Sequence, residues 1–520
     1  MIAKMKSCAV KGFEAIIVDV EVDITLGLPV FNMVGLAETA VRESRDRVRS
    51  ALQNAGYTFP MDRVVVNLAP ADFKKEGTGL DLPVALGILC AQGLFQTSSA
   101  ASWLFAGELS LDGYLRPVKA ALPFALAARD HGFKGIILPK ENGAQAALVK
   151  DIQVLAPGHL AQVVDFLAGK ANLAPLEPDL SLLLESDGAD RETDFSYVRG
   201  QTHVKRAMEV AAAGHHHILL NGPAGSGKSL MAKCLPGIMP EPSFEEAMEI
   251  TKVYSVAGVS REPGQPLGAR PFRSPHHSIS DAGLVGGGTV PKPGEITLSH
   301  NGVLFLDELP EFRRSVLEVL RQPIEDGVIT LARANAQATY PCRFMLAGAM
   351  NPCPCGNLTN PDRECTCTPA KIEQYKNKIS GPLMDRMDIL VEVPRLSFNE
   401  MTADGDRESS KAIRKRVEKA RDIQARRFKK AGRTCFSNAD MGPKLLQQFC
   451  PLDAQSRRVV EQAMKQFNLS GRAYASILKL ARTIADLADA PDILKPHVLE
   501  AVQYKRLDQS RDDFSRSSIL

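Results

Sequence analysis

A glycine-rich turn between two apolar runs is the first stretch whose residues could do chemistry. Residues 219–235 read LLNGPAGSGKSLMAKCL, and part of this stretch fits the spacing G-x-x-x-x-G-K-[ST]. Because glycine places no side chain in the way, backbone N–H groups and a helix N-terminus can point at phosphate oxygens. We therefore predict an ATP site in which Lys228 contacts the β- and γ-phosphates and Ser229 binds Mg²⁺. Its residues are Gly222, Pro223, Ala224, Gly225, Ser226, Gly227, Lys228 and Ser229.

Two adjacent acids follow a second apolar run, GVLFLDEL. If the run is a buried parallel strand, it ends beside the phosphate-binding turn and delivers Asp307 and Glu308 there. Asp307 is then expected in the Mg²⁺ shell, and Glu308 is placed to orient or deprotonate the attacking water. The alternative is a carboxylate pair at a strand end that only faces solvent.

Two further polar residues extend this chemistry. Asn351 ends the strand candidate RFMLAGAMN and is predicted to hold the same water from the other side. Arg386 lies in SGPLMDRMDI, between Asp385 and Asp388. The residues alone leave two interpretations of Arg386 equal, an ion pair with one of these aspartates or an arginine that reaches a neighbour's γ-phosphate.

Four of the ten cysteines lie within the fifteen residues CPCGNLTNPDRECTC. They form a C-x-C-x9-C-x-C cluster whose thiolates could close a tetrahedral zinc site, with free thiols as the alternative. Zinc here would stiffen the loop that carries Asn351. The run GHHHILL is given a structural role, because consecutive side chains entering a strand point to alternating faces. The four predicted zinc ligands are Cys353, Cys355, Cys365 and Cys367.

These residues need strands and helices to bring them together. The strand candidates HILLNG, GVLFLDEL, RFMLAGAM and ILVEVP alternate with helical or loop segments, which predicts an α/β fold with a parallel sheet. Ser470 is placed to cap the helix that carries Arg472. We predict an α/β N-terminal domain, a linker rich in proline and acids, a P-loop core and an all-helical end, over residues 1–170, 171–195, 196–395 and 396–520.

Composition sets the broad class of the protein. With 520 residues, of which 44% are hydrophobic and 24% charged, two to four globular domains are expected. Neither an apolar run of about 18 residues nor a signal peptide is present, so a cytoplasmic protein that does not enter a membrane is predicted. The net charge of +3 does not select a partner, but residues 411–433 hold eleven Lys or Arg against two acids. That run is either a solvated helix face or a contact to a phosphate backbone.

The order of these motifs resembles that of AAA+ ATPases. GPAGSGKS matches Walker A, VLFLDE matches Walker B, and Asn351, Arg386 and Arg472 match sensor 1, the arginine finger and sensor 2. RPFRSPHHSISDAGLVGGG, LRQPIEDGVITLARA, AMNPCPCG and ISGPLMDRMD are similar to the Mg-chelatase-like branch, and specifically to the ComM/YifB family. The resemblance covers essentially the whole chain.

The resemblance implies an assembly and an activity. It implies a ring, usually a hexamer, with ATP between subunits, so that Arg386 acts in trans and Arg472 reaches nucleotide from a mobile helical lid. It also implies an ATP-driven DNA motor, a helicase that drives branch migration and helps to integrate single-stranded DNA during natural transformation or recombination. Single-stranded and branched DNA are the implied partners, with recombination proteins as further ones.

Two segments are predicted to contact DNA. GVITLARANAQATYP is interpreted as two strands around a turn at Arg333 to Asn335, the position of a pore hairpin in related motors, although a hairpin used only for packing is the alternative. The insert around Lys292 would supply a second pore loop. Neither segment is rich in aromatic residues, which favours salt-dependent backbone contacts over base stacking. The predicted DNA contacts are Lys292, Arg333 and Asn335.

The N-terminal domain resembles the Lon protease domain, of the ribosomal S5 domain 2-like type, without its catalytic residues. Gly79 stands where that family has its serine and Leu122 where it has its lysine, while Thr78 and Lys119 lie nearby out of register. We therefore predict a scaffold for DNA, a partner or a ring neighbour, and no peptidase activity. The alternative functions are a Mg-chelatase-type motor subunit and an ATPase that remodels a protein partner.

Overall fold

The computed structural model describes residues 2–36, 43–75, 77–184, 193–259, 266–288, 291–333, 336–360, 363–396, 407–432 and 435–506. The chain divides into two compact units. The N-terminal unit comprises Met1–Gly188, Phe244–Ala269 and Ala332–Thr339. The P-loop unit comprises Ala189–Ser243, Arg270–Leu331 and Tyr340–Leu520. Among the helices of these described ranges, none is long and apolar enough to cross a bilayer.

Alternating side chains build the main sheet of the N-terminal unit. In β2, Val18, Val20 and Val22 are fully buried, and the acids between them take the opposite face of the pleat. The sheet order is β3-β4-β2-β1-β5-β8-β9, in which β2 is antiparallel to both of its neighbours, β4 and β1, and the remaining pairs are parallel. The strands are β1 (Ile2–Lys11), β2 (Glu14–Thr25), β3 (Phe31–Val34), β4 (Arg63–Ala69), β5 (Trp103–Phe105), β8 (Gly135–Ile137) and β9 (Gln153–Leu155), with β6 (Glu108–Leu109) and β7 (Leu115–Arg116) as a separate pair.

Helices cover this sheet, and one of them comes from a distant part of the sequence. Helix α11 packs on α5, where the Ala120 N–H donates to the Ser255 carbonyl at 2.9 Å and Met248 and Val256 join the apolar core. The segment Phe244–Ala269, which contains α11, therefore belongs to the N-terminal unit although it follows the phosphate-binding turn in sequence. The helices of the unit are α2 (Ser44–Asn54), α3 (Asp81–Ala91), α4 (Thr97–Ala100), α5 (Ala121–Asp130), α6 (Lys140–Ala146), α7 (Leu160–Leu167), α8 (Ser181–Leu184) and α11 (Phe244–Ala257).

The P-loop unit is built on a parallel sheet of five strands. Its order is β11-β14-β17-β10-β18, and every neighbouring pair is parallel. All residues of β14 and β17 are buried, as expected for parallel strands that helices cover on both faces. The predicted α/β fold with a parallel-sheet core is confirmed. The strands are β10 (Ile218–Asn221), β11 (Phe272–Arg273), β14 (Val303–Leu306), β17 (Met345–Met350) and β18 (Ile389–Glu392), beside the short pair β12 (Gly286–Gly287) and β13 (Lys292–Pro293).

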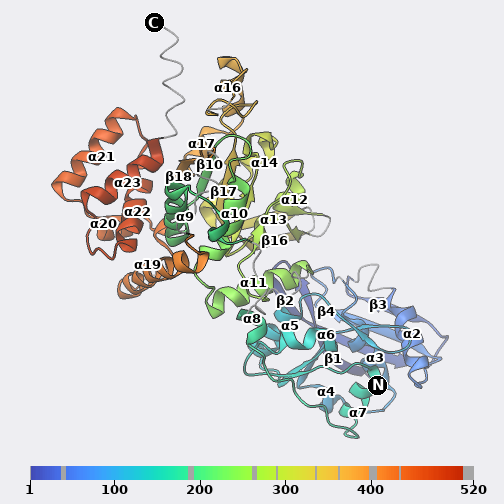
Figure 1. Ribbon diagram of the computed structural model, residues 1–520. Helices are drawn as coiled ribbons and strands as arrows, with labels where there is room; N and C mark the ends of the chain where they lie inside the picture. The colour runs from blue at the N-terminus through green and yellow to red at the C-terminus, as the bar shows by residue number, and fades with distance from the viewer. Residues whose placement is uncertain are drawn as a thin grey trace. The chain divides into compact units, whose positions relative to one another are not determined.

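The C-terminal part of this unit is helical, as predicted. Figure 1 shows α20 to α23 gathered as one group, and α23 packs on β18 while α22 packs on α9. Ser470 caps α22 by accepting from the Ala473 N–H at 3.2 Å, which confirms the predicted N-cap. The helices and 3₁₀ turns of the unit are η1 (Phe195–Tyr197), α9 (Thr202–Gly214), α10 (Lys228–Ile238), α12 (Asp281–Val285), α13 (Glu295–Leu298), η2 (Leu309–Glu311), α14 (Arg314–Glu318), α15 (Arg321–Asp326), α16 (Pro369–Lys376), α17 (Gly381–Met384), α19 (Ser410–Lys430), η3 (Asn438–Asp440), α20 (Pro443–Phe449), α21 (Ala454–Gln466), α22 (Gly471–Leu487) and α23 (Lys495–Arg506).

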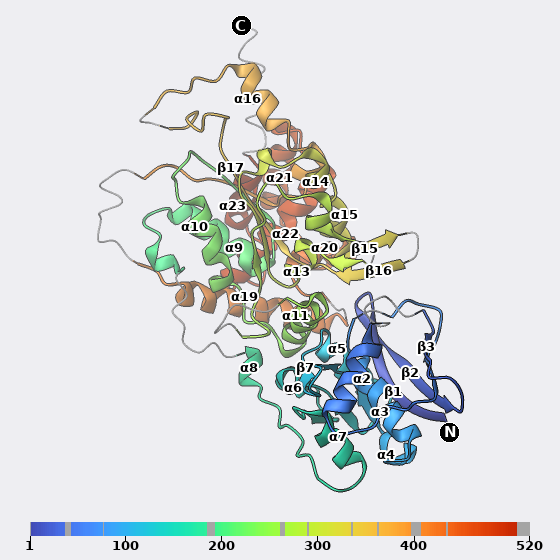
Figure 2. The ribbon, with the colours of Figure 1, turned by 90° about the vertical axis from the view of Figure 1, so that its right-hand side faces the viewer.

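The predicted strand pair is present as a hairpin. β15 (Val328–Arg333) and β16 (Ala336–Pro341) form a two-stranded sheet, drawn in yellow in Figure 2. Its end, Ala332–Thr339, belongs to the N-terminal unit, where a Cβ on Gly12 would lie 3.1 Å from the Ala338 Cβ. The predicted boundaries at 170, 195 and 395 remain predictions. Each compact unit combines segments that are distant in sequence, so the units do not test boundaries between consecutive domains.

Candidate nucleotide site

The phosphate-binding turn, Gly222–Ser229, joins the end of β10 to the start of α10. β10 lies between β17 and β18, so the turn emerges where the sheet continues in both directions, the usual position of a ligand in an open parallel sheet. Gly227 caps α10 with φ of +88°, a left-handed backbone that glycine adopts without strain. A Cβ on Gly222 would overlap the Val393 carbonyl. Two glycines of the motif are therefore required by the backbone itself.

Lys228 is buried within this turn. Its Nζ donates to the carbonyls of Gly222 and Pro223, at 2.6 and 2.8 Å, and to Asn351 Oδ1 at 3.2 Å. Burial lowers the pKa of the Lys228 ammonium, and the charges of Asp307 and Glu308 partly oppose that effect. An anion placed on the turn would supply the counter-charge that the buried ammonium has only in part.

The two predicted acids lie where β14 ends. Ser229 Oγ donates to Asp307 Oδ2 at 2.6 Å, so the hydroxyl and carboxylate predicted to share Mg²⁺ are in contact. Glu308 has φ of +52°, a left-handed conformation that is strained for a residue with a side chain. Its carboxylate is half exposed and lies 3.5 Å from His277 Nδ1. The sequence reasoning missed His277, although it follows β11, the parallel neighbour of β14.

The donor set fits a magnesium-bound triphosphate. Helix α10 presents its N-terminal N–H groups, Lys228 supplies a cation, and Ser229 with Asp307 supplies oxygen ligands. Ser226 Oγ is buried and without a hydrogen-bond partner in the described part of the chain, so this hydroxyl can still donate to a bound anion. The turn therefore has unused donors as well as the charge for a phosphate group.

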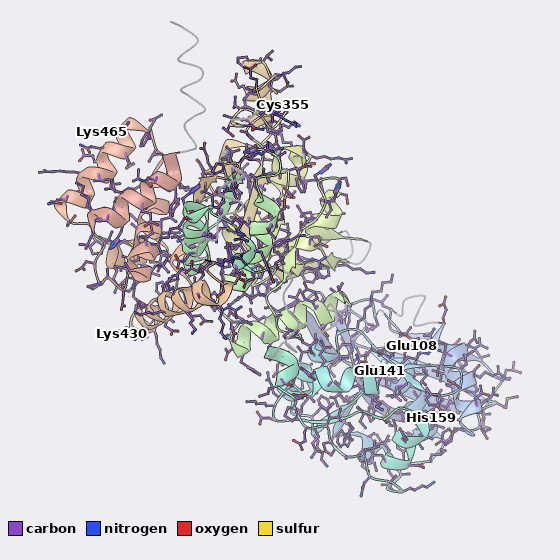
Figure 3. All side chains as sticks on the ribbon, in the orientation of Figure 1. Glu108, Glu141, His159, Cys355, Lys430 and Lys465 are labelled. Atoms are coloured by element: carbon purple, nitrogen blue, oxygen red, sulfur yellow. The ribbon has the colours of Figure 1, made fainter. Side chains whose placement is uncertain are left out.

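The cysteine loop adjoins this site. Cys353 follows Asn351 by two residues, and a Cβ on Gly356 would lie 3.7 Å from the Ala224 N and 3.9 Å from the Asn351 Cγ. Tyr375 of α16 also packs against the Asn351 backbone, and burial raises the pKa of its hydroxyl to about 12. The loop thus contacts both the phosphate-binding turn and the residue predicted to hold water. Figure 3 shows Cys355 close to α16.

The four predicted zinc ligands converge. All four sulfurs lie within 4.8 Å of one another. The Cys353–Cys355 sulfurs are 3.4 Å apart, and Cys365 lies 3.6 Å from each of them. Zinc–sulfur bonds of about 2.3 Å in a tetrahedron require sulfurs about 3.8 Å apart, close to these values. Backbone N–H groups of Asn357 and Thr366 lower the pKa of the Cys355 thiol to about 6, which favours the thiolate that binds metal.

The two predicted arginines lie elsewhere and share one partner. Arg386 Nη2 contacts Glu325 Oε1 at 2.5 Å, and Arg472 Nη2 binds the same oxygen. Arg386 therefore pairs with neither Asp385 nor Asp388, the partners that the ion-pair interpretation named. In the described structure, neither guanidinium contacts the phosphate-binding turn of its own chain. Glu325 was not predicted as a site residue. It lies in the stretch LRQPIEDGVITLARA, which carries only a family resemblance, and it is 61 residues from Arg386 in sequence.

The histidine run has structural partners. The buried His216 contacts Thr483 of α22 at 2.8 Å through Nε2 and lies 3.4 Å from Asp388 Oδ2 through Nδ1. The Leu346 N–H of β17 donates to His217 Nδ1 at 3.0 Å. Asp388 also accepts from Ser476 Oγ of α22 at 2.6 Å. These bonds fasten the sheet of the P-loop unit to the helix that carries Arg472.

The predicted DNA contacts are only partly described. Lys292 is exposed in the short strand β13. The backbone of Arg333 ends β15, while its side chain and all of Asn335 lie outside the described residues.

The basic run forms α19, whose last residue, Lys430, is labelled in Figure 3. Several of its cations are already used within the unit. Arg416 and Arg427 pair with Glu209 and Asp486, and Lys419 pairs with Asp489. Much of the charge of α19 is therefore neutralised internally, whereas Lys411, Lys415, Lys429 and Lys430 are exposed.

The peptidase positions of the N-terminal unit contain no nucleophile with a base. A Cβ on Gly79 would face Val118 at 3.5 Å, and Leu122 is fully buried. Thr78 Oγ1 donates to the Glu108 carboxylate, and the Lys119 side chain lies against Gly258 at the end of α11. Thr78 is thus bonded to another group, and Lys119 packs against the end of α11.

Comparisons with known proteins agree with this architecture. Three family models match the chain. "Magnesium chelatase, subunit ChlI" matches residues 194–401, and "Subunit ChlI of Mg-chelatase" matches residues 20–142. "Magnesium chelatase, subunit ChlI C-terminal" matches residues 407–505. Competence protein ComM of Haemophilus influenzae is 43% identical over 97% of this chain and 98% of its own length. Protein YifB of Salmonella typhimurium is 42% identical over 96% of each chain. A magnesium-chelatase 67 kDa subunit of Chlorobaculum tepidum is 25% identical over 30% of this chain and 23% of its own. The chain therefore belongs to the ComM/YifB family, in the Mg-chelatase-like branch of AAA+ proteins.

Proposed function

We propose that the protein is an ATPase whose hydrolysis drives movement along DNA. The observation that supports this most directly is the meeting of Lys228, Ser229, Asp307 and Asn351 around one phosphate-binding turn. A relative named as a competence protein matches almost the full chain, which supports the involvement of DNA. The finer activity proposed here is branch migration by a hexameric ring that integrates single-stranded DNA.

In this proposal each side chain has one task. Lys228 exchanges the carbonyls of Gly222 and Pro223 for β- and γ-phosphate oxygens, and Ser229 and Asp307 hold Mg²⁺. The metal neutralises charge that develops on the phosphates. Glu308 takes a proton from the attacking water, and Asn351 orients that water. Arg386 and Arg472, which lie together at Glu325, act on a phosphate held by a neighbouring subunit.

The test is ATP hydrolysis by the full chain with different nucleic acids. Single-stranded, duplex and four-way DNA are added in turn, and the rate is measured as salt is raised. We expect stimulation by single-stranded and branched DNA that falls steeply with salt, because backbone phosphates dominate the contact. Equal rates with and without every DNA would refute the DNA motor.

The family models favour one second function, a chelatase-type motor subunit. Such a subunit would hydrolyse ATP without a response to DNA, so the same assay separates the two. Stimulation by a protein partner, in place of DNA, would instead support an ATPase that remodels proteins.

We also propose that Cys353, Cys355, Cys365 and Cys367 hold structural zinc. Protein purified without chelator is expected to contain about one zinc per chain, because four thiolates complete a tetrahedral site. Cys353→Ser with Cys355→Ser should release the metal, whereas Cys90→Ser, a buried cysteine outside the cluster, should not. Elemental analysis that finds no zinc in the unsubstituted chain would favour free thiols.

A further inference from the structure

In the proposed function Arg386 acts on a phosphate of a neighbouring subunit, but its contacts hold it within its own subunit. An arginine that stabilises a phosphate on another subunit must present its N–H groups outside its own subunit. The Arg386 side chain is only 7% exposed. Its Nη1 donates to the Pro382 carbonyl at 2.5 Å and its Nη2 to Glu325 at 2.5 Å. Both terminal nitrogens are thus bonded inside the P-loop unit.

The hydrogen-bonding capacity and the charge of the Arg386 guanidinium are nevertheless only partly satisfied in this position. Its Nε is buried without a hydrogen-bond partner in the described structure. Burial lowers the pKa of Arg386, the Arg472 cation lowers it further, and Glu325 opposes both effects. Among the described residues, Glu325 is therefore the carboxylate that pairs with Arg386 and compensates its charge. Removing that partner should favour an arginine that leaves the buried position.

Glu325 binds two cations in the way that a phosphate oxygen would. Arg386 comes from the segment after α17 and Arg472 from the start of α22, and both use Nη2 on the same Oε1. Arginine forms charge-assisted hydrogen bonds of the same kind with carboxylates and phosphates. The Glu325 side chain is 43% exposed, so it can move into solvent when an incoming anion displaces it.

We propose that Glu325 is a positioning residue that holds Arg386 in its own subunit until a γ-phosphate of the neighbouring subunit displaces the carboxylate. The inference rests on the proposed trans role of Arg386. Glu325 then opposes hydrolysis by a subunit that is not correctly paired in the ring. Its effect acts through Arg386.

The test compares ATP hydrolysis by full-length variants at several protein concentrations. Glu325→Gln removes the charge but keeps an oxygen acceptor, and we expect kcat/KM to rise on the order of tenfold, since a charge-assisted bond no longer competes with the phosphate. Glu325→Asp keeps the charge but shortens the reach, so a smaller rise is expected. Glu461→Gln, which removes an exposed ion pair with Lys465, is the matched control and should leave the rate unchanged.

A double variant separates this inference from the proposed function. Because Glu325 acts through Arg386, Glu325→Gln combined with Arg386→Ala should be as slow as Arg386→Ala alone. A rise in that double variant would assign the effect to Arg472 and overturn the inference. Rates at or below the unsubstituted level for both Glu325→Gln and Glu325→Asp would also overturn it, and Glu325→Asp decides the matter if Glu325→Gln does not fold. Normal hydrolysis by Arg386→Ala alone would instead refute the role of Arg386 in the proposed function, and with it this inference.

Discussion

Lys228 and Glu308 differ in what surrounds them, and that difference separates binding from hydrolysis. Lys228 is buried and bonded to two carbonyls of the phosphate-binding turn, so its ammonium already lies where the phosphates are expected to bind. Glu308 is half exposed, has a strained φ of +52°, and lies 3.5 Å from His277 Nδ1. A group in such a position can meet water without contacting the phosphates.

Substitutions at these two residues should therefore fail in different ways. Lys228→Ala is expected to weaken ATP binding, because the β- and γ-phosphates lose their cation. Glu308→Gln is expected to bind ATP normally but hydrolyse it at least 10²-fold more slowly, about the loss seen when a general base is removed. Nucleotide binding by fluorescence and steady-state hydrolysis measure the two effects.

Glu311→Gln is the matched control for Glu308→Gln. Glu311 is three residues further on, half exposed, and paired with Lys378 at 3.2 Å. It should hydrolyse ATP normally. A Glu308→Gln protein with the same rate as this control would remove Glu308 from the mechanism.

The sequence could predict the residues of the turn but not all their neighbours. Asp307 and Asn351 each follow an apolar strand, and parallel strands bring their carboxyl ends to one edge, so their approach to the turn follows from pattern alone. Glu325 lies in a short helix, and its partners come from segments 61 and 147 residues away. No local periodicity encodes such a meeting, because it depends on how the helical end packs on the core.

At the scale of elements, a buried polar junction joins the sheet to α22. Asp388 precedes β18 and contacts His216, before β10, and Ser476 in α22. Although burial alone would raise it, the neighbouring His216 and the Lys505 ammonium hold the pKa of Asp388 well below its usual range. Because its folded-state pKa is depressed, the carboxylate contributes stability above the unfolded-state pKa of about 3.9 and loses it as pH falls toward the folded-state value.

Asp388→Asn should therefore lower the free energy of unfolding at pH 6 by about 2 kcal/mol, since the amide cannot replace the charge. The difference from the unsubstituted protein should stay constant from pH 6 to about 4 and shrink as pH falls from about 4 to about 2, because the carboxylate then protonates in the unfolded chain before it does in the folded one. Urea unfolding at several pH values measures this, with the exposed Asp385→Asn as control. A constant difference across that range would mean that the charge of Asp388 contributes no stability.

The cysteine loop links a second element to the site. Gly356 adjoins Ala224, and Tyr375 adjoins Asn351, so a loose loop would disturb both the turn and the water-holding side chain. Cys353→Ser with Cys355→Ser is thus expected to lower kcat several-fold more than it raises KM. Cys355, which is partly buried, should show part of that loss when it alone is replaced by Ser, if three thiolates still hold the metal. Unchanged kcat in the zinc-free double variant would show that the metal acts only on stability.

The strands of the P-loop sheet could be predicted from local sequence, but the packing partner of a helix from a distant part of the chain could not. The stretches HILLNG, GVLFLDEL, RFMLAGAM and ILVEVP become β10, β14, β17 and β18, because three or more buried apolar residues in a row favour a covered parallel strand. Helix α11 follows α10 by five residues yet packs on α5. Its apolar face suits either partner, so only the folded chain reveals which unit contains it.

At the scale of the whole molecule, the proposed site is incomplete in one chain. The phosphate-binding turn, Asp307 and Asn351 lie together, but Arg386 and Arg472 are held at Glu325. If ATP lies between subunits of a ring, hydrolysis belongs to the interface, with the turn from one subunit and the arginines from the next. A heterologous interface of this kind lets two defective chains complement each other.

Mixing two inactive variants tests that arrangement. Arg386→Ala should bind ATP but lose on the order of 10³ in rate, while its Glu308 remains intact. Glu308→Gln lacks the base but keeps Arg386. In randomly mixed rings about a quarter of interfaces pair the intact Glu308 of one chain with the intact Arg386 of the next, so partial activity should return. Differently tagged chains recovered together establish that mixed rings form. If such rings stay inactive, Arg386 acts within its own chain or only in the ion pair with Glu325, because a trans arginine needs nothing beyond these interfaces to restore hydrolysis.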